Sequence, residues 1–129
     1  MKDVIQTVKT GDAPAAKGPY NQGVVSDGVV YVSGQLPLDP ATGKVVEGDF
    51  KAQVAQTIRN MEAVLKAGGS DLAHILRVNV FLADMSRFGE FNEVYERMMP
   101  QPYPARSARG VDLGPFRVEL DAVARTVEQ

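Results

Sequence analysis

The chain has 129 residues, 44% of them hydrophobic, with a formal net charge of −2, no cysteine and one histidine, His74. This length predicts one globular domain over residues 1–129, with a core that needs neither disulfides nor a structural metal. The composition excludes thiolate nucleophiles, cysteine-ligated metals and histidine-rich centres, and its charge gives no support to nucleic-acid binding. No segment reads as a signal peptide or membrane span, so we expect a soluble, cytoplasmic protein with no membrane partner.

Short strands are predicted in the first part of the chain. Residues 4–8 alternate weakly and predict a first strand. The β-branched runs 23–26 and 29–34 flank Asp27-Gly28, a dipeptide that favours the tight turn of a two-residue hairpin. We therefore expect these two runs to pair as an antiparallel hairpin.

Two segments carry the apolar period of amphipathic helices. In the first, which Asp49 caps and Gly68-Gly69 ends, apolar residues recur every three or four positions from Phe50 to Leu65. The second begins at residues 84–86 and ends before Pro100. Between the two helices, residues 75–83 alternate as a strand.

The last two strands are predicted at residues 105–111 and 116–127, which completes the order βββαβαββ. This order favours an α+β fold in which two helices cover one face of a mixed sheet. The other face would carry Tyr31, Phe81 and Val123, and a second subunit is its expected cover because large exposed apolar patches are unusual on monomers.

Arg106 and Glu119 form the most informative pair of candidate residues. If strands 105–111 and 116–127 form a hairpin centred between Asp112 and Leu113, the two side chains lie directly opposite each other. A bulge at Gly114-Pro115 would break that register. The pair is either an ordinary surface ion pair or a carboxylate-binding arginine beside an acid that positions water.

The other candidates are weaker when taken singly. Tyr20 lies among turn-forming residues and either packs on the surface or walls a pocket. Ser33 and Gly34 either end a strand or let a ligand approach the backbone. His74 has no second histidine or cysteine to complete a site, and we expect it to be solvated.

Taken together, five segments resemble the Rid family (RidA/YjgF, the reactive intermediate or imine deaminases). They are 13–23, 32–37 followed by 39–43, 80–85 (with Phe88, Asn92 and Tyr95), 104–107 and 118–124. The resemblance implies a chorismate-mutase-like fold and a homotrimer with clefts between subunits. It also implies cofactor-free hydrolysis of 2-imino acids and their enamine tautomers, such as 2-aminoacrylate, to 2-oxo acids and ammonia. By its motifs, Arg106 holds the substrate carboxylate, Glu119 positions water, and Tyr20, Ser33, Gly34 and Asn92 line the cleft.

The chain departs from the family pattern near Arg106. Ala108 stands where many members carry a cysteine, Arg109 replaces an aliphatic residue, and the stretch between Arg106 and Glu119 is shorter. These differences bear on substrate identity, so two alternatives stay open. One is a dedicated catabolic deaminase on the same fold, and the other is a non-enzymatic metabolite-binding or chaperone-like protein.

Overall fold

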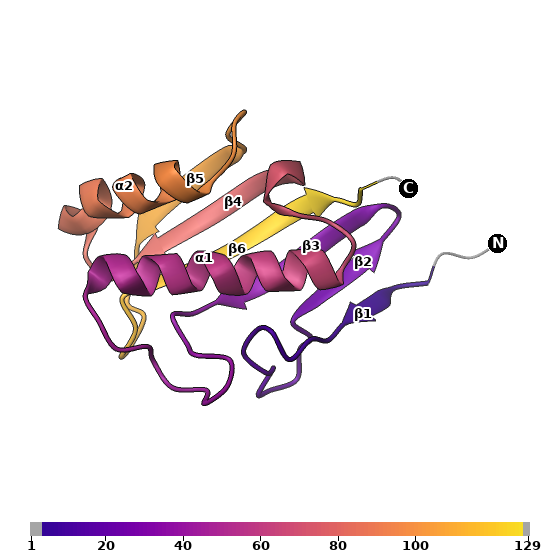
Figure 1. The fold of residues 1–129 in the computed structure, drawn as a ribbon, viewed down its shortest axis with the longest axis horizontal. Coiled ribbons are helices and arrows are strands. Elements are labelled where there is room, and N and C mark those ends of the chain that lie inside the picture. The colour runs from indigo at the N-terminus through magenta and orange to yellow at the C-terminus, as the bar shows by residue number, and fades with distance from the viewer. Residues whose placement is uncertain (1–3, 128–129) are drawn as a thin grey trace.

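Two helices cover one face of a six-stranded sheet in the computed structural model, which describes residues 4–127 (Figure 1). The strands and helices are β1 (Gln6–Val8), β2 (Gly23–Ser26), β3 (Val29–Gln35), α1 (Phe50–Ala67), β4 (Ile75–Leu82), α2 (Phe88–Met98), β5 (Ala105–Gly110) and β6 (Val118–Arg125). Their order in the sheet is β1-β2-β3-β6-β4-β5. The predicted element order and the α+β class are confirmed.

The first hairpin and the first helix form for the reasons that the sequence indicates. Asp27 and Gly28 adopt positive φ angles of 51° and 75° between β2 and β3. Asp49 caps α1 by accepting a hydrogen bond from the backbone N–H of Ala52 at 2.9 Å. A Cβ at Gly68, which follows α1, would lie 2.9 Å from Val30 Cγ1, so glycine lets the helix end close to β3.

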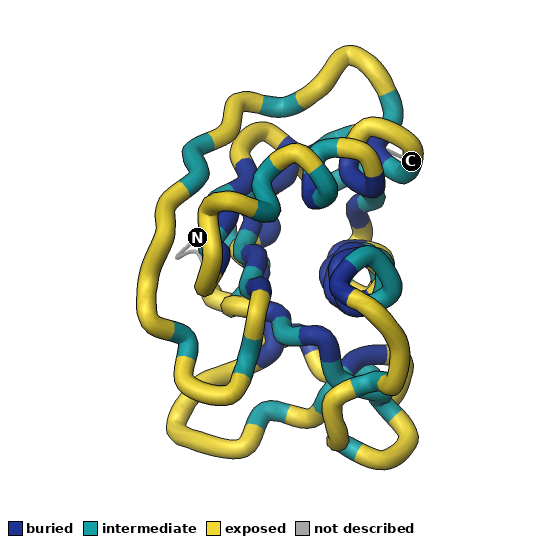
Figure 2. Tube along the Cα trace, turned by 90° about the vertical axis from the view of Figure 1, so that its left-hand side faces the viewer, coloured by how far each residue is buried: buried dark blue, intermediate teal, exposed yellow. Residues whose placement is uncertain are grey.

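The core lies between the helices and the sheet, where buried residues of both layers face each other (Figure 2). Alternation along the strands decides which side chains enter it. Val78, Val80 and Leu82 of β4 are buried toward the helices, while Phe81 between them points to the uncovered face. No helix among residues 4–127 is long and apolar enough to span a membrane.

The predicted hairpin of the last two strands is wrong. β5 pairs with β4 in parallel, and β6 lies between β3 and β4. The connection 111–117 passes over the end of β4, where Val111 N–H donates to Leu82 O and Ala83 N–H donates to Arg117 O, each at 3.0 Å. The turn signals in this connection are real, but they join strands that are not neighbours.

Smaller differences concern element ends. The first strand begins at Gln6, two residues after its predicted start, and β6 spans only Val118–Arg125 of the predicted 116–127. A 3₁₀ turn over Met85–Arg87 precedes α2, because Asp84 Oδ1 accepts from the Ser86 backbone N–H at 3.0 Å and begins the turn there.

Gln22 ties the N-terminal loop to the start of β2. Its side chain is 4% exposed; Oε1 accepts from the Thr10 N–H at 2.7 Å, and Nε2 donates to the carbonyls of Thr10 and Pro14 at 3.0 and 2.8 Å. Because these bonds cross from residue 22 to residues 10–14, they hold the loop that carries Tyr20 against the sheet.

Gln22→Leu removes these bonds and leaves backbone groups without partners, so we expect it to lower the free energy of unfolding by about 2–3 kcal/mol. Gln35→Leu is the matched control, because Gln35 is equally buried but makes one such bond, to Ser33 O at 3.1 Å; its expected cost is about 1 kcal/mol. Urea denaturation at one protein concentration measures both. Equal losses in the two variants would contradict the tethering role of Gln22.

Candidate active site

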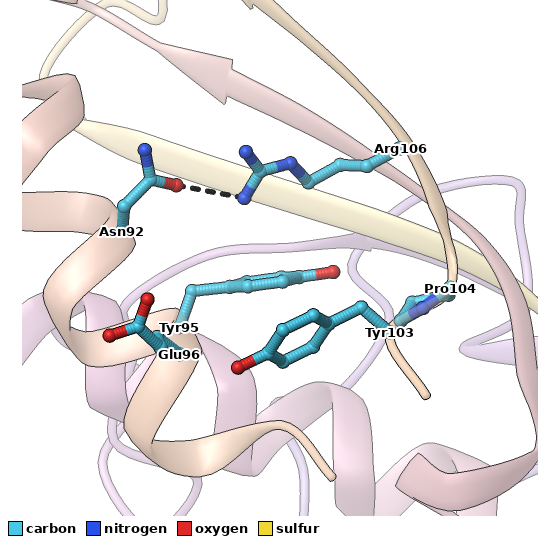
Figure 3. A pocket seen from close by; sticks show the side chains of 6 residues that line it. All are labelled: Asn92, Tyr95, Glu96, Tyr103, Pro104 and Arg106. Atoms are coloured by element: carbon cyan, nitrogen blue, oxygen red, sulfur yellow. Dashed lines mark hydrogen bonds between the residues drawn. The ribbon is translucent and has the colours of Figure 1, made fainter. Parts of the chain in front are cut away.

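Arg106 projects from β5 onto α2, on the face of the sheet that the helices cover. One guanidinium N–H, on Nη1, donates to Asn92 Oδ1 at 2.8 Å. The guanidinium carbon lies 4.8 Å from the ring centroid of Tyr95 and 5.3 Å from that of Phe88 (Figure 3). An amide and two aromatic rings therefore orient this cation, and no ion pair among residues 4–127 includes it.

A pocket of about 330 Å³ opens beside Arg106. Its lining residues are Asn92, Tyr95, Glu96, Tyr103, Pro104 and Arg106. In Figure 3 the side chains of Arg106 and Tyr95 extend toward each other from β5 and α2, with the Tyr103 ring nearby. The pocket combines a cation with aromatic walls, a lining suited to an anionic group attached to an apolar one.

Glu119 belongs to β6 and points to the uncovered face of the sheet, where it packs against the backbone of β3. A Cβ at Gly34 would lie only 2.6 Å from Glu119 Oε2, so glycine at this position leaves the room that the carboxylate occupies. The pairing of β3 with β6 shifts register between Val32 and Gln35, so Gly34 sits in an irregular stretch of the strand.

The environment of Glu119 raises the pKa of its carboxyl group. Burial is the main cause that raises its pKa above the ordinary value, and the nearby negative charge of Asp121 raises it further. Asp121 itself accepts a hydrogen bond from Asn79 Nδ2 at 2.8 Å. A half-buried carboxyl with a raised pKa holds a proton more readily than an ordinary glutamate, which suits it to proton transfer.

Ser33 and Tyr20 lie on the side of Glu119 rather than of Arg106. Ser33 Oγ donates to Asn21 O at 2.5 Å, and Ser33 N–H donates to Gln22 O at 2.9 Å, which joins β3 to the loop that contains Tyr20. The Tyr20 ring is 52% exposed, and its hydroxyl accepts from the Lys17 backbone N–H at 3.4 Å. This hydroxyl is therefore only weakly engaged.

The six candidate residues thus fall into two groups. Arg106 and Asn92 lie on the helix-covered side, whereas Glu119, Gly34, Ser33 and Tyr20 lie by β3 and β6. The strand register explains this separation: Arg106 pairs with Val78 of β4, and Glu119 pairs with Phe81 of the same strand. Val78 and Phe81 are three residues apart and point to opposite faces, so one chain cannot bring Arg106 and Glu119 together. The cross-strand pairing expected of these two residues is therefore wrong.

Sequence reasoning misses the aromatic support of Arg106. It names Phe88 and Tyr95 only among the residues that carry the family resemblance, yet both rings face the guanidinium. The available signal is spacing: Phe88, Asn92 and Tyr95 stand at positions i, i+4 and i+7 and therefore share one face of the helix. Tyr103, which lines the same pocket, follows a proline-rich segment and carries no recognisable signal.

The residues that depart from the family pattern are also separated. Ala108 pairs with Val80 and packs against the core, while Arg109 pairs with Phe81 and is exposed on the uncovered face.

His74 contacts Asp71, with 2.6 Å between His74 Nδ1 and Asp71 Oδ1. The hydrogen bond with His74 holds the pKa of the Asp71 carboxyl below its usual value. Within residues 4–127, no group of three or more histidine, cysteine, aspartate or glutamate side chains lies close enough together to hold a metal ion.

Comparison with known proteins places the chain in a family. Residues 10–126 match the family model described as Endoribonuclease L-PSP. The human 2-iminobutanoate/2-iminopropanoate deaminase is 38% identical over 92% of this chain and 88% of its own, and the mouse protein of that name is 41% identical over 96% and 91%.

Solved structures agree with these sequence matches. RidA from the Antarctic bacterium Psychrobacter sp. PAMC 21119 is 42% identical, with a TM-score of 0.89 over 93% of this chain and 98% of that one. E. coli TdcF with bound serine is 32% identical, with a TM-score of 0.86 over 95% and 99%. The resemblance to the Rid proteins is confirmed, and the chain belongs to the endoribonuclease L-PSP family that includes these RidA-like relatives.

Proposed function

We propose that the protein is a deaminase that hydrolyses 2-imino acids and their enamine tautomers to 2-oxo acids and ammonia without a cofactor. The relatives named 2-iminobutanoate/2-iminopropanoate deaminase support this assignment. The presence in the chain of an oriented arginine and a half-buried acid also supports it, because the reaction needs an anion-binding group and a base for water.

Arg106 is proposed to bind the substrate carboxylate. A guanidinium presents a planar fork that accepts a carboxylate through two hydrogen bonds. Asn92 occupies one nitrogen of Arg106, and the rings of Phe88 and Tyr95 limit its rotation. The fork is therefore oriented before substrate arrives, which reduces the entropy lost on binding.

Glu119 is proposed to activate the attacking water. The carboxylate takes a proton as the water oxygen bonds to the electrophilic iminium carbon, which gives a carbinolamine. Glu119 then gives this proton to the nitrogen. The C–N bond breaks as the hydroxyl oxygen forms the carbonyl, and the departing ammonia takes the hydroxyl proton and leaves as ammonium. The iminium form and water thus become a 2-oxo acid and an ammonium ion, with no oxidant or reductant required.

Arg106 and Glu119 lie on opposite faces of the sheet, and this placement is the main support for a site shared between subunits. A site that uses both residues must draw them from different chains. We therefore propose a homotrimer in which Arg106 of one subunit meets Glu119 of the next. The uncovered face, with its exposed Tyr31 and half-buried Phe81 and Val123, is the proposed contact surface.

The endoribonuclease description of the family does not change this proposal. RNA binding draws on clustered lysines and arginines along a groove, whereas this chain has a net charge of −2. A role limited to binding a small metabolite is the nearer alternative, since the structure of E. coli TdcF was solved with bound serine. Measuring turnover distinguishes a deaminase from a protein that only binds a metabolite, because binding needs Arg106 but not Glu119.

Imines made in situ by a serine or threonine dehydratase test the reaction through the rate of 2-oxo acid release. Arg106→Ala is expected to lower kcat/KM by roughly 10- to 100-fold, as the charge-assisted pair is lost. Glu119→Gln is expected to lower kcat by about 10²- to 10⁴-fold through loss of the base. Arg97→Ala, an exposed arginine of α2, is the control. Absence of acceleration by the wild type would overturn the proposed function.

Mixing subunits tests the shared site. Arg106→Ala and Glu119→Ala chains are each expected to have strongly reduced activity alone. After they are unfolded and refolded together, assemblies regain sites that combine an intact Arg106 with an intact Glu119 from a neighbour. Light scattering should give a mass close to three times the 13.9 kDa of one chain. A monomeric mass, or no recovery of activity in the mixture, would contradict the intersubunit site.

The expected pH dependence of kcat follows from the direction in which the pKa of Glu119 is shifted. Because the carboxylate is the working form, kcat falls as pH drops through the raised pKa of Glu119. Asp121→Asn removes the neighbouring negative charge and lowers that pKa, so the acidic limb of the profile moves to lower pH. Glu47→Gln, an exposed acid of the loop before α1, should leave the limb in place. A limb that Asp121→Asn leaves unmoved would contradict this role for Glu119.

A further inference from the structure

Tyr95 is the most buried of the residues whose side chains contact the Arg106 guanidinium. Its side chain is 5% exposed, and its ring packs on Phe91 with centroids 5.5 Å apart. Arg106 is exposed, and the guanidinium carbon lies 4.8 Å from the Tyr95 centroid. A buried ring therefore forms the surface on which the long, exposed side chain of Arg106 lies.

The Arg106 guanidinium contacts the face of the Tyr95 ring. Burial raises the pKa of Tyr95, which outweighs the opposing effect of the Arg106 charge, so the phenol stays neutral at pH 7. A phenolate ion pair with Arg106 is thereby excluded. What remains is attraction between the cation and the ring quadrupole.

The hydroxyl of Tyr95 takes no part in this support. It is the one buried side-chain oxygen or nitrogen within residues 4–127 that has no hydrogen-bond partner. In Figure 3 it points along the stem of Arg106 toward Pro104, away from the bond between Arg106 and Asn92. Removing it should cost nothing, because an unsatisfied buried donor contributes no favourable bond.

We propose that Tyr95 is a positioning residue whose ring face holds the Arg106 guanidinium in the orientation that receives the substrate carboxylate. Asn92 holds one nitrogen, the Tyr95 ring contacts the guanidinium on one side at 4.8 Å, and Phe88 closes a second side at 5.3 Å. The consequence for substrate rests on the proposed deaminase function, whereas the ordering of the guanidinium does not depend on it.

Two substitutions separate the ring from the hydroxyl in the full chain. Tyr95→Phe keeps the ring face, so KM for the imino acid and the Kd of pyruvate should stay within about twofold of wild type. Tyr95→Leu removes it, so both constants should rise by roughly 3- to 30-fold while kcat is largely kept. Phe50→Leu is the matched control, because Phe50 is also a buried ring under an arginine, Arg87, at 5.4 Å.

A ligand-free measurement decides the proposal if the protein proves inactive. The ¹H–¹⁵N heteronuclear NOE of Arg106 Nε should be high in wild type and Tyr95→Phe, and low in Tyr95→Leu. Phe50→Leu should leave this NOE and the pyruvate Kd unchanged, whatever it does to Tm. An ordered Arg106 in Tyr95→Leu, or equal loss of pyruvate binding in Tyr95→Phe and Tyr95→Leu, would overturn the proposal. Absent imine hydrolysis with an ordered Arg106 would overturn only the deaminase assignment.

Discussion

The pairing of β5 with β4, rather than with β6, is the constraint on which the arrangement of this molecule depends. Because β6 is inserted between β3 and β4, Arg106 and Glu119 take their orientation from Val78 and Phe81 of the same strand. Residues three apart in a strand face opposite ways. The chain therefore places the arginine and the acid on opposite faces of the sheet, and a site that used both would have to draw them from different chains.

Each half of the site is built by local packing that one chain completes alone. The guanidinium of Arg106 is oriented by Asn92 and two rings of α2, so its geometry comes from the docking of α2 beside β5. The carboxylate of Glu119 takes the space that Gly34 leaves, and its raised pKa comes from burial between strands. Assembly would then bring together two halves that are already ordered, which keeps the entropy cost of forming the site low.

Sequence reasoning succeeds wherever the signal is local. Asp27-Gly28 needs positive φ, Asp49 supplies a capping oxygen, and the apolar residues of α1 repeat with the helical period, so these elements follow from neighbouring residues alone. The identity of the candidate residues follows from motifs and from their chemistry. Their spatial relation does not, because the same turn residues that close a hairpin also allow the chain to pass over the end of β4.

The sequence by itself determined the element order, the α+β class, the family and the residue types suited to the chemistry. Tertiary structure decided which strands are neighbours, and with that the face on which each candidate side chain lies. The physical reason is that a strand exposes identical backbone donors and acceptors whichever neighbour it pairs with. Its partner is chosen by the burial of distant apolar faces, and no short window of sequence contains that information.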